Sequence, residues 1–241
     1  MKMKLMLKYS FSILFCLLSV IMNGQEKKEQ KKDTTAFKRT ERFGVRIGLD
    51  LSKFARSLYD KNYKGLEIVG DYRLTKNFYL AAEIGNENKI TDERQLNFTT
   101  KGSYIKVGFD YNFYKNWLNM ENMIHLGLRY DASTFSQELN SYKIYDTSTY
   151  FPVPPAIVDG TKYDGLSAQW IEVVAGIKAK LFNNFYGGIS VRANYLASQS
   201  RPDNFDNLYI PGFNRTYNGS FGAGWNYTLT YFVPIYKKKK K

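Results

Sequence analysis

The strongest constraint on the fold of this chain is an alternation of apolar and polar residues with period two. In residues 221–231, large apolar or small apolar side chains at odd positions alternate with Gly, Asn and Thr at even positions. Such an alternation gives a β-strand one apolar face. It recurs in eight segments and predicts strands near residues 43–55, 64–74, 78–87, 101–113, 120–134, 166–181, 185–197 and 219–233.

The distribution of charge decides which way the apolar faces point. A soluble barrel buries its apolar face inside, whereas a transmembrane barrel turns that face to lipid and keeps a polar lumen. In the middle of the predicted strands, the apolar parity, which includes Val107 and Leu126, carries no charged residue. The sequence therefore predicts an all-β fold, an eight-stranded antiparallel up-and-down transmembrane β-barrel. An aromatic girdle at headgroup depth is expected from Tyr72, Phe78, Phe113, Trp117, Phe185 and Tyr231.

The two ends of the chain are basic, and the first has the pattern of a targeting segment. Lys2, Lys4 and Lys8 precede an apolar run at residues 11–22 that is too short for a membrane helix, which is typical of a secretory signal peptide. We expect a signal peptide at 1–25, a basic periplasmic segment at 26–41, the barrel at 42–236 and a periplasmic Lys tail at 237–241. Within the basic segment, Asp33-Thr34-Thr35 resembles a short O-glycosylation pattern of Bacteroidota.

The predicted connections differ in length between the two ends of the barrel. Three are short and contain Asn77, Asn116 or Asn184, which suit tight turns. Longer connections are expected near 56–63, 88–100, 135–165 and 198–218. Outer-membrane barrels have short periplasmic turns and long extracellular loops. We therefore expect both termini in the periplasm of a Gram-negative bacterium.

The parity opposite the apolar face carries basic and acidic residues in equal numbers, Lys180 among the basic ones. Charges inside a protein are costly unless they are paired or hydrated. A narrow barrel is filled by its own side chains, so this balance predicts a salt-bridged lumen and no open pore. The expected network comprises Arg46, Asp50, Glu67, Asp71, Arg73, Glu83, Lys106, Asp110, His125, Arg129, Asp131, Glu172, Lys178 and Arg192.

Candidate catalytic groups are scarce. His125 is the single histidine, and no Ser/His/Asp or His/Asp grouping occurs in the long connections. We expect no catalytic residues, no metal site and no cofactor. The net charge of +13 includes Lys runs at the two ends without a nucleic-acid-binding motif, so anionic lipid headgroups are the expected contacts and nucleic acid is not.

The long connections near 135–165 and 198–218 contain apolar and proline residues that solvated loops do not need. Clustered exposed aromatics mark interfaces, and prolines lower the entropy cost of binding. The alternative is that the two connections pack on each other as a cap over the barrel. The predicted partner-binding residues are Tyr145, Tyr150, Phe151, Pro152, Pro154, Pro155, Phe205, Tyr209 and Phe213.

Several motifs give the chain a family likeness: Arg42-Phe43-Gly44-Val45-Arg46, the strand 104–111, the Pro-rich connection and the closing 231–236. With these it resembles an uncharacterised family of small outer-membrane β-barrels of Bacteroidota. The resemblance implies an outer-membrane location and no established enzyme activity. Small barrels of this kind serve larger envelope machines. By analogy, the resemblance also suggests an accessory role in outer-membrane protein assembly. We expect a non-enzymatic scaffold that binds other outer-membrane or periplasmic proteins. A small passive channel and a membrane-embedded lipid-modifying enzyme remain alternatives.

Overall fold

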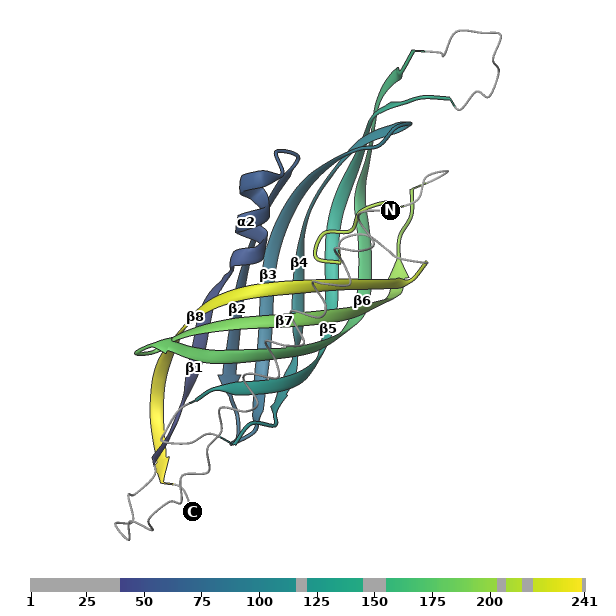
Figure 1. Cartoon of the computed structure of the whole chain (residues 1–241). Coiled ribbons are helices and arrows are strands. Elements are labelled where there is room, and N and C mark those ends of the chain that lie inside the picture. Colours follow the sequence, from purple (N-terminus) through teal and green to yellow (C-terminus); the bar gives the residue numbers. More distant parts are fainter. Residues whose placement is uncertain (1–39, 116–120, 145–154, 203–206, 214–218, 240–241) are drawn as a thin grey trace, which may run out of the picture. The chain divides into compact units, whose positions relative to one another are not determined.

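The barrel forms by hydrogen bonding between strands that follow one another in the chain. The structure is a computed structural model that describes residues 40–115, 121–144, 155–202, 207–213 and 219–239. Within these residues, eight antiparallel strands close into a barrel in chain order (Figure 1). The predicted eight-stranded antiparallel barrel is thus confirmed. The strands are β1 (Thr40–Asp50), β2 (Tyr63–Arg73), β3 (Phe78–Asp92), β4 (Leu96–Asn112), β5 (Met123–Tyr142), β6 (Ile157–Phe182), β7 (Phe185–Gln199) and β8 (Phe221–Lys239).

The tight turns lie at the end of the barrel that contains the start of β1 and the end of β8. Thr40 of β1 pairs with Lys239 of β8. At the β6–β7 turn, Asn184 has φ of 63°, a left-handed conformation that Asn tolerates better than most residues. The run 237–239 belongs to strand β8, so the barrel extends three residues beyond its predicted end at 236. Their ladder partners are Thr40, Glu41 and Arg42.

At the opposite end, two hairpins are much longer than predicted. β3 and β4 remain paired up to Asp92 and Asn97, and β5 and β6 remain paired up to Tyr142 and Ile157. The expected loops at 88–100 and 135–165 are therefore mostly strand. The sequence did not show this because the outer parts of these hairpins lack the apolar parity that identifies the other strands. In Figure 1 the β5–β6 hairpin projects beyond the rest of the barrel wall.

A short helix, α2 (Leu51–Tyr59), replaces the predicted continuation of the first strand to residue 55. The side chain of Asp50 accepts a hydrogen bond of 2.8 Å from the backbone N–H of Ser52 and so caps the helix. Leu51, Phe54 and Leu58 follow helical spacing and are exposed on one face. Within the described residues, no helix is long and apolar enough to span a membrane.

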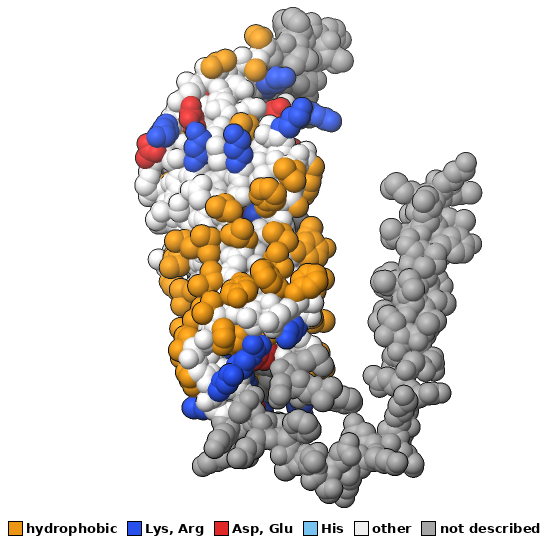
Figure 2. Space-filling model, turned by 90° about the vertical axis from the view of Figure 1, so that its left-hand side faces the viewer, with side chains coloured by type: hydrophobic (Ala, Val, Ile, Leu, Met, Phe, Trp, Pro, Cys, Tyr) orange, Lys and Arg blue, Asp and Glu red, His pale blue; other side chains and the backbone are white. Residues whose placement is uncertain are grey.

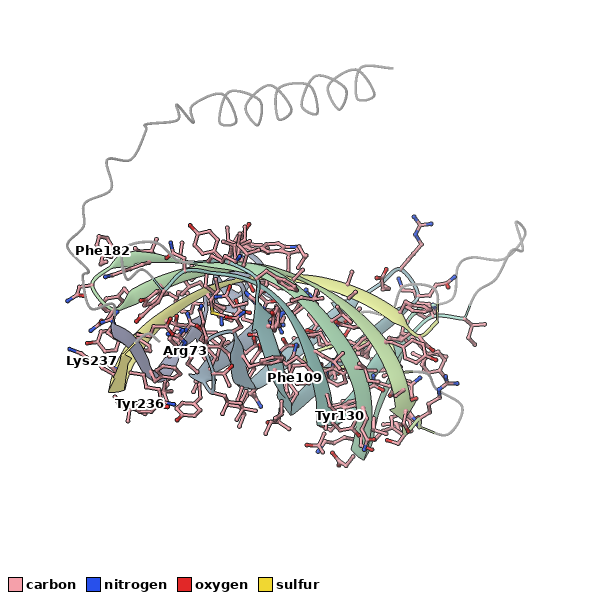
Figure 3. The ribbon with its side chains drawn as sticks, turned by 90° about the horizontal axis from the view of Figure 1, so that it is seen from below. Arg73, Phe109, Tyr130, Phe182, Tyr236 and Lys237 are labelled. Carbon is pink, nitrogen blue, oxygen red and sulfur yellow. The ribbon has the colours of Figure 1, made fainter. Side chains whose placement is uncertain are left out.

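The outer wall of the barrel is apolar. Large hydrophobic side chains form a band around the middle, and charged side chains lie above and below it (Figure 2). Phe109 and Tyr130 point outward from the wall, whereas Tyr236 and Lys237 lie at the end with the turns (Figure 3). The predicted outward direction of the apolar faces is confirmed. Exposed members include Ile47, Leu66, Ile84, Ile105, Val107, Leu126, Leu128, Val173, Ile177, Ile189, Val191 and Leu229.

Candidate functional site

A chain of ion pairs crosses the interior of the barrel near its middle. Arg192 of β7 lies 2.7 Å from Glu83 of β3 and 2.6 Å from Glu172 of β6. Lys106 of β4 lies 3.0 Å from the other oxygen of Glu172. Arg129 of β5 extends the chain, since its Nε is 3.8 Å from Glu83. Five strands are thereby connected through side chains that have almost no contact with solvent.

The chain ends on Asp110, which accepts a hydrogen bond of 2.7 Å from Arg129. His125 lies beside it, with Nε2 4.0 Å from Asp110. Because His125 is one member of this polar interior, its surroundings match a structural role.

A second group of ion pairs lies toward the end with the tight turns. Asp71 of β2 accepts hydrogen bonds of 2.7 Å each from Arg46 and from Lys178. Below it, Arg42 makes two hydrogen bonds of 2.8 Å with the carboxylate of Glu121, the bidentate geometry of strong pairs. These contacts connect β1, β2, β6 and the β4–β5 connection.

Other charged members of the predicted network have different partners. Arg73 pairs with Glu41 at 2.9 Å, and Glu67 accepts a hydrogen bond of 2.5 Å from Tyr104. Asp50 accepts from Asn226 as well as capping α2. Asp131 is fully buried and has no hydrogen-bond partner among the described residues.

The structure therefore places the whole predicted set in the interior, with Lys178 the least buried. Lys180, which the sequence also assigned to this face, is exposed near the β6–β7 turn. The ladder between Lys180 and Phe182 contains an irregularity. The irregularity follows Lys180, whose ladder partner Tyr186 is buried, so Lys180 keeps the inward parity and is exposed at the end of the strand.

A carboxylate that the sequence analysis missed organises the other end of the interior. Glu87 of β3 is fully buried and accepts hydrogen bonds from Lys53 of α2 at 2.5 Å and from Tyr63 at 2.9 Å. Its second oxygen accepts from the Tyr209 hydroxyl at 2.6 Å and from the Gly212 backbone N–H at 3.1 Å. Glu87 continues the inward parity of Glu83, and that spacing was the available signal.

The connection before β8 folds back into the barrel. Tyr209, Ile210 and Phe213 are buried, and Phe213 packs edge to face on Trp170 with ring centroids 5.6 Å apart. Around them lie apolar side chains that close the outer end of the lumen: Tyr104, Phe135, Leu166, Ala168 and Leu196. We call residues 207–213 the plug segment.

This packing corrects part of the predicted partner surface. Tyr209 and Phe213 are inaccessible to a partner, so their assignment to an exposed interface was wrong. Their apolar rings fill the lumen, an option that composition alone does not distinguish from an exposed patch. Pro155 is exposed. The predicted residues Tyr145, Tyr150, Phe151, Pro152, Pro154 and Phe205 lie outside the described residues.

Between the central ion pairs, α2 and the plug segment there is a cavity of about 1040 Å³. Its floor includes Lys106, Glu172 and Arg192, and α2 contributes Lys53 and Arg56. At its edge, Asp60 accepts a hydrogen bond of 2.7 Å from Lys89. This bond lowers the pKa of Asp60, so its carboxylate stays charged in neutral and mildly acidic conditions.

The chemistry of the interior is that of a paired ionic network next to a polar cavity. In the described ranges, no three His, Cys, Asp or Glu side chains gather as metal ligands. The fold and these sites together define a closed eight-stranded β-barrel with an apolar exterior, an ionic interior and a plugged outer end.

The chain belongs to the DUF6048 family, a domain of unknown function, whose model matches residues 6–238. A search of curated proteins gives no match. Neisserial surface protein A has a similar structure, with 11% identity and a TM-score of 0.42 over 82% of this chain and 99% of that one. The attachment invasion locus protein Ail of Yersinia pestis gives 10% identity and a TM-score of 0.39 over 80% and 98%. Values this low carry no information on activity or partners.

Proposed function

We propose that the protein is an integral outer-membrane β-barrel that acts as a non-enzymatic accessory subunit and binds other envelope proteins through its long outer hairpins. The membrane location in this proposal rests on the band of exposed apolar side chains around the barrel. Water would oppose a continuous apolar surface of this extent, whereas hydrocarbon accepts it. Since the eight strands pair in a ring, and α2 flanks the outer parts of β2 and β8 where their pairing with β1 ends, most backbone groups of the strands are satisfied within the wall, as a bilayer requires.

The filled interior supports a scaffold more than a passive channel. Ion pairs cross the lumen at two levels, and the plug segment occupies its outer end. A selective pore is more naturally lined by rings of one charge sign. A lipid-modifying enzyme, the other alternative, is supported by no grouping of nucleophile and base among the described side chains.

The β5–β6 hairpin is the proposed partner-binding element. A bilayer needs strands of about 9–11 residues, and β5 and β6 have 20 and 26 residues. The excess lies at the outer end, where side chains such as Val158 are exposed and the wall of the barrel no longer supports them. A projecting hairpin with apolar side chains is suited to contact a second protein.

The test is a shortened hairpin. Replacing residues 140–160 with an Asn-Gly turn retains the buried side chains of Gln137 and Leu139. We expect this variant to remain in the outer-membrane fraction and to stay heat-modifiable on gels, because its wall is intact. It should lose the envelope proteins that crosslink to and co-purify with the unaltered barrel.

The matched control shortens the neighbouring hairpin by replacing residues 92–97 with an Asn-Gly turn, which retains the pairing of Thr91 with Phe98 and the buried side chain of Phe98. We expect this control to retain the same co-purified proteins. If the shortened β5–β6 barrel also retains all of them, the accessory role through this hairpin is wrong. If neither protein fractionates with the outer membrane, the proposed location is wrong.

A further inference from the structure

The wall of the barrel is interrupted beside α2. Pairing between β1 and β8 stops at Asp50 and Thr228, and pairing between β1 and β2 stops at Leu49 and Ile68. The outer parts of β8 (221–227) and β2 (63–67) therefore have no strand partner on this side within the described residues. Helix α2 occupies the interval between them and contacts both strands (Figure 1).

Helix α2 is amphipathic across this interval. Leu51, Phe54 and Leu58 face outward, whereas Lys53 points into the barrel toward Glu87. A helix side does not continue the hydrogen-bonded ladder of a strand edge. The boundary between α2 and β8 is therefore held by side chains alone.

The cavity of about 1040 Å³ reaches the outer surface at this boundary. Its lining includes the buried Arg192 and Glu172 as well as Tyr59 and Trp225, which are 74% and 58% exposed on the outside of the barrel. Gly224 of β8 lies between these groups and also lines the cavity. Because exposed and buried residues line the same cavity, the cavity passes from the apolar exterior to the ionic interior.

The inner part of the cavity is rich in hydrogen-bond donors. Five basic residues line the cavity as a whole against three acidic ones: Lys53, Arg56, Lys89, Lys106 and Arg192 against Asp92, Glu93 and Glu172. Three acidic residues outside the lining pair with the basic ones: Glu87 with Lys53, Asp60 with Lys89 and Glu83 with Arg192. Among these donors, Arg192 Nε is buried and has no hydrogen-bond partner among the described residues. A spare donor on a cationic group favours a carboxylate or phosphate over a neutral head.

The outer part of the cavity suits an alkyl chain. Trp225 of β8 packs edge to face on Tyr227 with ring centroids 5.0 Å apart and lines the cavity together with Tyr59 of α2. Small-molecule sites measure about 300–1,000 Å³, so the volume is sufficient for one chain and its head. We propose that this cavity binds a single-chain amphiphile with an anionic head, which enters sideways between α2 and β8.

The proposal is tested by filling the cavity at Gly224. A Cβ at this position meets no described heavy atom within 4 Å, so Gly224→Phe places a ring in open space. Protein purified in a neutral detergent is incubated with palmitate or with palmitoyl lysophosphatidate, and native mass spectrometry measures retained ligand. We expect the unaltered barrel to retain one molecule of at least one of them and Gly224→Phe to retain at least tenfold less.

The control is Gly70→Phe on β2, which faces outward, far from the cavity lining, and has only ordinary contacts at its Cβ position. It should retain ligand as the unaltered barrel does. Heat-modifiability verifies that both variants are folded. Equal retention by Gly224→Phe and Gly70→Phe overturns the site.

A second variant tests the head and does not depend on the first. Arg56 is partly exposed, and its ion pair with Asp60 is loose at 3.7 Å, so Arg56→Gln leaves the fold intact. We expect it to retain several-fold less of the anionic ligand and to leave the weaker retention of hexadecanol unchanged. Retention of hexadecanol equal to that of both anionic probes overturns the anionic preference, and retention of neither anionic probe by the unaltered barrel overturns the proposal.

Discussion

At the scale of single residues, position relative to the apolar band decides what an exposed side chain does. Leu126 and Val158 are both exposed apolar residues on neighbouring strands. Leu126 lies within the band, and Val158 lies on the outer β5–β6 hairpin beyond it. In water the two positions would tolerate a charge equally, whereas in a bilayer only the second would.

This difference gives a direct test of membrane insertion. We expect Leu126→Arg to reduce the free energy of unfolding in phospholipid vesicles by about 2–4 kcal/mol, the cost of a lipid-facing cation near the bilayer midplane. Val158→Arg should change it by less than about 0.5 kcal/mol, as surface substitutions do. Urea titration of vesicle-inserted protein measures both. Equal effects of the two substitutions would place the band in water.

At the scale of elements, the strand faces were predictable and the helix and plug were not. A bilayer would impose apolar residues on one parity, and this pattern allowed Val107 and Leu126 to be assigned from sequence. For α2, Leu49 and Leu51 continue the alternation of β1, and the helical spacing of Leu51, Phe54 and Leu58 becomes informative only once Asp50 is recognised as a cap. Burial of the plug segment depends on the width of the lumen, which no local pattern encodes.

Glu87 connects three elements, because its donors come from α2, β2 and the plug segment. Glu87→Gln removes the charge that pairs with Lys53 and replaces one acceptor oxygen by a donor. Hydrogen bonds to charged groups contribute about 1.5–3 kcal/mol each. We expect amide hydrogen exchange in residues 207–213 to become at least tenfold faster while exchange in β3 to β6 is unchanged.

Glu138→Gln is the matched control, since Glu138 lies on the outer hairpin and is only partly buried. It should leave exchange in the plug segment as it is. Unchanged exchange in Glu87→Gln would show that the apolar packing of Phe213 on Trp170 holds the segment without the carboxylate.

At the scale of the whole molecule, the plug and the ion pairs obstruct the lumen independently. The plug segment closes the outer end, whereas the pairs of Arg192 and of Asp71 cross the barrel at deeper levels. Removing one partner of a buried pair is costly, so these deeper contacts resist opening. We therefore expect the cavity beside α2 to end on these ion pairs and not to continue as a pore.

The closed floor predicts the electrical behaviour of the protein. In planar bilayers we expect no steady conductance from the unaltered barrel, and none from a variant in which residues 208–212 are replaced by Gly and Ser. The reason is that loss of the plug leaves the ion pairs of Arg192, Glu83 and Glu172 across the lumen. A porin inserted under the same conditions verifies the measurement. Stable conductance from the variant alone would identify the plug as the gate of a channel, and stable conductance from both proteins would replace the scaffold by a passive channel.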